Sequence, residues 1–67
     1  MLNINDIVKV TKVIDGKTSI QFEIGRIIYI GRRALIEFQK NICGHNGNSI
    51  GKNRCCWMCD FDAIQKI

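Results

Sequence analysis

The sequence has no proline and only one histidine, one tryptophan and one tyrosine among its 67 residues. No stretch approaches the ~20 apolar residues that a membrane-spanning helix needs, and no long amphipathic stripe indicates a surface helix. The first six residues lack the basic segment and long apolar run of a secretory signal peptide. We therefore expect a cytoplasmic protein without a membrane segment, and one too small for an elaborate enzyme with separate lobes.

Apolar residues make up 46% of the chain. A chain this apolar can bury enough surface to offset the entropy of ordering, so we do not expect disorder. A single domain of 67 residues has a marginal core. We expect a second copy to cover one apolar face, which predicts a homodimer.

The formal net charge is +4 at pH 7, from ten basic and six acidic residues. This balance is compatible with nucleic acid, a nucleotide or an acidic protein surface as a partner. A charge of this size also fits a solvated surface without such a partner. Charge alone leaves both interpretations open.

Short β-branched runs alternate with glycine-containing turns, which is typical of a small all-β domain. Alternation would place Ala34, Ile36 and Phe38 on one face of a strand, with Leu35 and Glu37 on the other. The expected strands are residues 6–13, 25–30, 34–38, 55–59 and 64–67, with a helical turn at 60–63.

Residues 43–59 contain all four cysteines, the only histidine and the only tryptophan. The glycines and asparagines of this stretch permit backbone conformations with positive φ and close approach to a ligand. A loop this long is uncommon in so small a domain unless it has a function. We therefore expect residues 44–54 to form a functional loop.

Several segments are similar to those of small uncharacterised phage and prophage proteins. The segments are the glycine–hydrophobic strand 25–28, the strand Ile36-Glu37-Phe38, the glycine–histidine loop 44–47 and the strand Cys56-Trp57 before an acidic turn. Together with the order of the predicted elements, they resemble a small five-stranded SH3-like barrel with a short helical turn before the last strand. The resemblance implies a single domain, 1–67, with an accessory role in a phage or mobile element, acting in the infected bacterial host.

The loop is suited to binding an anion. Glycine backbone N–H groups can form an anion-binding nest, the Arg32-Arg33 turn could approach the same rim, and Trp57 is expected to be partly core or to stack on a base. The candidate ligand-binding residues are Arg32, Arg33, Gly44, His45, Asn46, Gly47, Lys52, Arg54 and Trp57.

Zinc binding is an alternative for the same segment, since Cys43, His45, Cys56 and Cys59 offer enough sulfur and imidazole for a tetrahedral site. Alternation along a regular strand opposes this, because Cys56 and Cys59 would point to opposite faces. The competing interpretation is that the cysteines are buried or idle thiols. Disulfides are not expected in the cytoplasm.

Nucleophilic catalysis by a thiol with His45 as the base would need an orienting third group and an oxyanion pocket. A five-stranded barrel offers little concavity for either, so we expect a non-enzymatic binding protein. The expected ligand is a nucleic acid or a sequestered signalling nucleotide, in an anti-defence role. The alternatives are an inhibitor of a host protein such as a CRISPR effector, as some anti-CRISPR proteins are, and a zinc-stabilised structural module.

Overall fold

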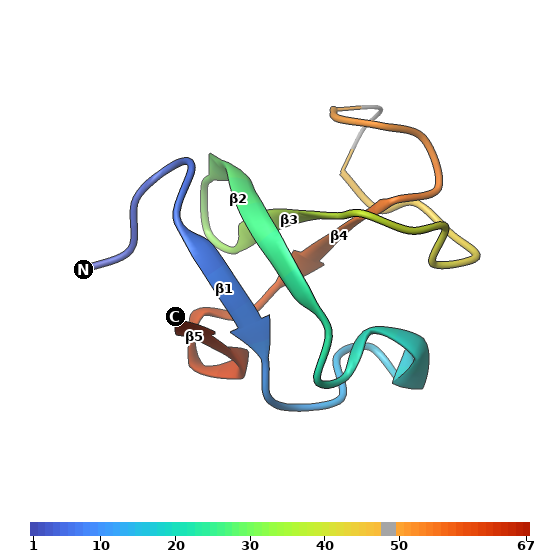
Figure 1. Ribbon diagram of the computed structural model, residues 1–67, viewed down its shortest axis with the longest axis horizontal. Coiled ribbons are helices and arrows are strands. Elements are labelled where there is room, and N and C mark those ends of the chain that lie inside the picture. Colours follow the sequence, from blue (N-terminus) through green and yellow to red (C-terminus); the bar gives the residue numbers. More distant parts are fainter. Residues whose placement is uncertain (48–49) are drawn as a thin grey trace.

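Five short strands form one antiparallel sheet in the computed structural model, which describes residues 1–47 and 50–67 (Figure 1). Their order across the sheet is β4-β3-β2-β1-β5. The strands are β1 (Ile7–Val10), β2 (Ile24–Ile30), β3 (Ala34–Phe38), β4 (Cys56–Cys59) and β5 (Ile64–Lys66), and the two 3-10 helices are η1 (Thr18–Ile20) and η2 (Phe61–Ala63).

The predicted all-β fold, its five strands and the helical turn before the last one are confirmed. Only β1 differs clearly, since it ends at Val10 and the chain then turns into the loop that contains η1. Within the described residues no pairing joins β4 to β5, so the sheet is open and the predicted barrel closure is not confirmed. No helix in the described part is long and apolar enough to span a membrane.

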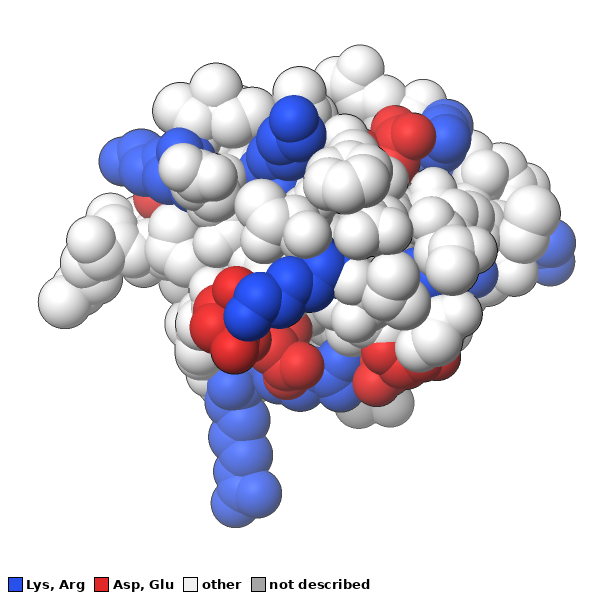
Figure 2. All heavy atoms as spheres, turned by 90° about the horizontal axis from the view of Figure 1, so that it is seen from below, with Lys and Arg blue, Asp and Glu red and all other residues white. Residues whose placement is uncertain are grey.

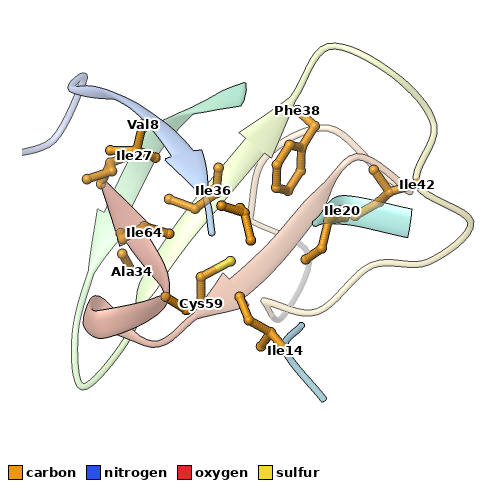
Figure 3. Packing of buried hydrophobic residues seen from close by; sticks show 12 residues of the cluster. Val8, Ile14, Ile20, Ile27, Ala34, Ile36, Phe38, Ile42, Cys59 and Ile64 are labelled. Carbon is orange, nitrogen blue, oxygen red and sulfur yellow. The ribbon is translucent and has the colours of Figure 1, made fainter. Parts of the chain in front are cut away.

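The core lies against one face of the sheet (Figure 3). Ala34, Ile36 and Phe38 of β3 all point into it and are at most 2% exposed, as the alternation predicted. Gly25 of β2 faces the same side, where an added Cβ would lie 2.5 Å from Ile36 Cγ2, so this position needs glycine for close packing. The other buried members of the core are Val8, Val10, Ile14, Ile20, Ile27, Ile42, Cys59, Ala63 and Ile64.

Two backbone carbonyl groups on the free edge of β4 already accept hydrogen bonds. In its antiparallel ladder with β3, alternate residues of β4 turn their carbonyl groups away from the neighbouring strand. Cys56 and Met58 are such residues. Cys56 O accepts a hydrogen bond from Asn46 N at 3.1 Å, and Met58 O accepts one from Arg33 Nη2 at 2.6 Å. The loop before β4 and the β2–β3 turn therefore occupy the groups through which another strand could pair.

Candidate functional site

In the segment between β3 and β4, residues 39–55, Ile42 packs into the core, and the stretch around Gly47 and Gly51 then crosses the outer face of the sheet, opposite the core. The backbone at Gly47 approaches so closely that an added Cβ would lie 2.7 Å from Leu35 Cδ1. At Gly51, with a φ of +78°, it would lie 2.5 Å from Ile28 Cδ1 and 2.6 Å from Cys56 Sγ. Leu35 and Cys56 are fully buried as a result. The glycines that suggested a ligand-binding nest thus have a packing role here.

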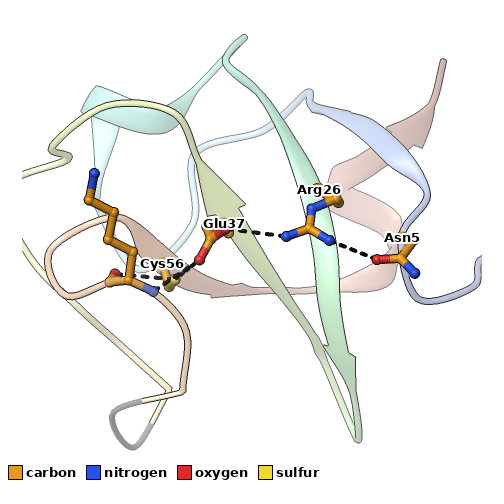
Figure 4. A network of polar contacts seen from close by, with 5 residues as sticks. Asn5, Arg26, Glu37 and Cys56 are labelled. Atoms are coloured by element: carbon orange, nitrogen blue, oxygen red, sulfur yellow. Dashed lines mark hydrogen bonds and ion pairs between the residues drawn. The ribbon is translucent and has the colours of Figure 1, made fainter.

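A half-buried carboxylate on β3 anchors this loop (Figure 4). Glu37 Oε2 accepts a hydrogen bond from Lys52 N at 2.9 Å and lies 3.9 Å from the Cys56 thiol, which also donates to Lys52 O at 3.4 Å. The other oxygen, Oε1, pairs with Arg26 Nη2 at 3.4 Å. One side chain thereby connects the loop to the middle of the sheet.

The start of the loop is held by its own turn. Asn41 Oδ1 accepts a hydrogen bond from Cys43 N at 2.7 Å, and Ile42 N donates to Arg54 O at 2.8 Å. Cys43 and Arg54 both have positive φ, of 61° and 65°, values that cost energy outside glycine. The loop therefore has a specific conformation at its base, although residues 48 and 49 of the predicted 44–54 loop lie outside the described residues.

The cysteines do not converge on a metal site. Cys56 lies under the loop and Cys59 lies in the core, so the prediction that they point to opposite faces is confirmed. Burial, with the charge of Glu37 second, raises the pKa of the Cys56 thiol to about 11, and burial raises the pKa of Cys59 to about 12. Both thiols therefore release their protons less readily than an ordinary thiol, which disfavours their action as nucleophiles. Among residues 1–47 and 50–67, no three His, Cys, Asp or Glu side chains form a potential metal cluster.

Arg33 is neutralised within the fold. Its Nη2 lies 3.0 Å from Asp15 Oδ2, and its Nε lies 3.2 Å from Asp60 Oδ1 in an ion pair without hydrogen-bond geometry. The hydrogen bond from Arg33 is the main reason that the pKa of Asp15 lies below its usual value. Arg32 is exposed, but its turn lies at the opposite end of β3 from the 44–54 loop, at the left of Figure 1. The sequence predicted that the Arg32-Arg33 turn could approach the 44–54 loop, and the backbone of the turn does not lie beside that loop.

Trp57 is half buried and packs against the core, as expected for partial core. Its indole N–H donates to Asp15 Oδ2 at 3.2 Å. The Lys17 ammonium lies 4.8 Å from the centroid of its ring and also reaches Gly44, where an added Cβ would be 3.3 Å from Lys17 Nζ. Sequence reasoning missed Lys17, because only folding brings the loop after β1 beside the 44–54 loop.

His45 does not present its ring nitrogens to solvent. Both Nδ1 and Nε2 are buried and have no hydrogen-bond partner within the described part of the chain. The residue as a whole is half buried. In this conformation His45 therefore has no accessible ring nitrogen with which to contact a ligand, the role expected from the sequence.

The charges sort into two groups. All six carboxylates form ion pairs, and they engage five of the ten basic residues: Lys12, Arg26, Arg33, Lys40 and Lys66. Figure 2 accordingly shows Lys and Arg interspersed with Asp and Glu over one face. The basic residues with no carboxylate partner in the described structure are Lys9, Lys17, Arg32, Lys52 and Arg54.

Of the predicted ligand residues, the loop itself contains Gly44, His45, Asn46, Gly47, Lys52 and Arg54, and Trp57 borders it at Gly44. The Arg33 side chain reaches this border through Asp15, which also accepts a hydrogen bond from Trp57, whereas the turn that carries Arg32 lies away from the loop. Comparisons with protein-family models, with curated proteins and with solved structures give no match. The function must therefore be argued from the geometry of the loop and its charges.

Proposed function

We propose that this protein is a small non-enzymatic binding protein whose 44–54 loop binds a phosphate-bearing ligand. One observation carries the proposal: of the five basic residues without a carboxylate partner in the described structure, Lys52 and Arg54 lie in this loop and Lys17 lies beside its Gly44. We call these three residues the cationic rim. Because the six Asp and Glu side chains form their ion pairs with other cations, the three side chains of the rim retain their positive charge for a partner.

The anchoring of the loop supports this function. Glu37 holds the backbone of Lys52, and the Trp57 ring holds the ammonium of Lys17 by a cation–π contact. A rim that is already ordered loses little conformational entropy when it binds. The exposed Lys52 and Arg54 side chains can reach a ligand without opening the fold.

Phosphate is the expected anion because a rim of several cations suits a ligand with more than one negative charge. Nucleic acid and a signalling nucleotide share this chemistry and differ in length. An accessory, anti-defence role in the bacterial cytoplasm is what the sequence resemblance to phage proteins implies, and we keep it as part of the proposal. The strand order and the η2 turn before β5 support an SH3-like class.

Fluorescence anisotropy tests the proposal, with a labelled single strand of about twenty thymidines as one probe and a labelled cyclic dinucleotide as the other. The variant K17Q/K52Q/R54Q removes the rim. We expect it to weaken binding at least about tenfold, and to reduce the dependence of log K on log salt by about 0.7 for each phosphate that the variant no longer neutralises. Quenching of Trp57, the only tryptophan, provides a label-free readout beside Lys17.

The matched control is K9Q/R32Q, which removes the other two cations without a carboxylate partner. This control variant should keep most of the wild-type affinity. A small decrease is expected only because its net charge is lower. Binding that depends on the control residues instead of the rim contradicts the proposal. Failure of the wild type to bind either probe also contradicts it, and favours the alternative of a protein target.

A further inference from the structure

The outer face of β1 and β2 is not covered by any described segment. Ile7, Phe22 and Ile24 expose 45%, 63% and 52% of their surface there. A groove of about 330 Å³ runs between β1, β2 and β3, and a second groove beside it shares Ile24 and Gln39. We define the open face by the residues Ile7, Phe22, Ile24, Arg26, Glu37 and Gln39.

Phe22 is held on this face in a strained conformation. Its φ is +67°, a value that a bulky side chain rarely adopts and that glycine or asparagine adopts readily. Its ring is largely exposed, and the ammonium of Lys9 lies 5.9 Å from its centroid. The core does not account for an aromatic residue at this position. A strained, exposed aromatic side chain instead indicates a contact outside the monomer.

We propose that the open face docks a second copy of this chain in a twofold-symmetric dimer. Charge supports this occupant. Two of the three cations at the face and its border are paired, Arg26 with Glu37 at 3.4 Å and Lys40 with Glu23 at 2.9 Å, which leaves only Lys9, beside the Phe22 ring, without a carboxylate partner among the described residues. Two copies with a net charge of +4 each repel one another overall, and a contact through a nearly neutral surface adds least to that repulsion.

The same charges make the face complementary to itself. In a twofold-symmetric dimer, if residue i of one copy contacts residue j of the other, then residue j of the first copy also contacts residue i of the second. Arg26 of one copy can therefore face Glu37 of the other, and the reverse, while Ile7, Phe22 and Ile24 of both copies become buried between them. Both signs and the apolar residues occur together on one patch, as such a contact requires.

A nucleic acid fits this face less well. Arg26 and Lys40 are paired with carboxylates, which leaves Lys9 as the single unpaired cation there among the described residues, and two of the three exposed apolar residues are isoleucines, which do not stack on bases as aromatic rings do. The dimer contact thus uses a different surface from the cationic rim. The inference does not rest on the proposed function.

Sedimentation velocity over a range from micromolar to millimolar protein tests the dimer. The wild type should shift with concentration toward twice the 7.7 kDa mass of the chain. Phe22→Asn should abolish the shift, and because asparagine suits a positive φ, it should keep or raise the thermal midpoint. Ile24→Glu should also give a monomer. Circular dichroism confirms that both variants are folded.

Phe61→Asn is the control, since it removes an aromatic side chain that is 42% exposed on η2, away from the open face. It should dimerise like the wild type. A wild type that stays monomeric at millimolar concentration overturns the proposal. A dimer that survives both Phe22→Asn and Ile24→Glu, or that is abolished in Phe61→Asn, overturns it as well, because the contact then uses another surface.

Discussion

The outer face of the sheet has two halves that share apolar residues but differ in what covers them. Over β3 and β4, the 39–55 segment buries Leu35 and Cys56 completely. Over β1 and β2, Ile7 and Ile24 remain about half exposed. The strands alternate in the same way on both halves. The difference shows that the loop, and not the strand pattern, decides whether this face becomes a second small core.

The half of the outer face over β3 and β4 is covered because the loop backbone lies close to the sheet and because one carboxylate holds the loop there. Gly47 and Gly51 bring the main chain onto Leu35 and Cys56, and Glu37 holds the backbone of Lys52. Nothing comparable crosses the open half in the described structure. The two halves should therefore respond very differently to the same kind of substitution.

The largest contrast is expected for truncation of one aliphatic residue on each half. Leu35→Ala should lower the free energy of unfolding by about 2–5 kcal/mol, because it leaves a cavity under the loop. Ile24→Ala should cost about 0.5 kcal/mol, as expected for an exposed position. Urea unfolding at low micromolar concentration, where a dimer does not contribute, measures both. Equal effects would contradict a buried second layer.

Glycine substitutions separate packing from backbone strain. Gly51 and Gly16 have similar φ values, +78° and +71°, but an added Cβ at Gly16 meets nothing within 4 Å. Gly16→Ala should cost about 1 kcal/mol from strain alone. Gly51→Ala should cost about 2–4 kcal/mol, because a clash with Ile28 and Cys56 is added. Thermal unfolding of both variants measures this difference, which reports the contact of the loop with the sheet. Equal losses of stability in Gly16→Ala and Gly51→Ala would contradict that contact.

A smaller effect is expected from the anchoring carboxylate. Glu37→Gln should lower stability by about 1–2 kcal/mol, because the hydrogen bond from Lys52 N and the pair with Arg26 lose the negative charge. Hydrogen exchange at the Lys52 amide should accelerate more than exchange in β2. Glu23→Gln, which breaks only the exposed pair with Lys40, should cost less than about 0.5 kcal/mol. If both variants behave alike, Glu37 does not anchor the loop.

The effect that is smallest at neutral pH is a loss of stability that develops only in alkali. The pKa of Cys56 is raised from 9.0 to about 11, so above pH 9 the unfolded chain releases this proton before the folded chain does. The contribution of the protonated thiol is complete below pH 9 and is lost as the pH rises toward 11. The thermal midpoint should therefore fall across this range, and Cys56→Ala should flatten the fall. Cys43→Ala, which removes an exposed thiol, is the control, and an unchanged slope in Cys56→Ala would argue against burial under the loop.

Local patterns predicted the elements well. The bounds of β3 and the inward position of Ala34, Ile36 and Phe38 agree with the alternation of the sequence, because a strand's faces follow from its period of two. The opposite orientations of Cys56 and Cys59 were predictable for the same reason. These features depend on neighbouring residues alone.

Features set by contacts between loops were not predictable. Arg33 was expected to face a ligand, but it binds Asp15, which is 18 positions earlier in the chain. Lys17 was not among the candidates, because its approach to Trp57 depends on how two loops fold beside each other. The burial of Leu35 likewise depends on a backbone contact with Gly47 that no periodic pattern encodes.

The occupied carbonyl groups of Cys56 and Met58 limit how molecules of this kind can polymerise. A filament held together by strand addition needs two available flanks on every subunit, that is, both outer edges of its sheet, one for each neighbour. Asn46 and Arg33 block the flank formed by β4, which leaves only β5 for such pairing. Once two β5 strands have paired, neither subunit has a flank left for a third, so growth ends at two.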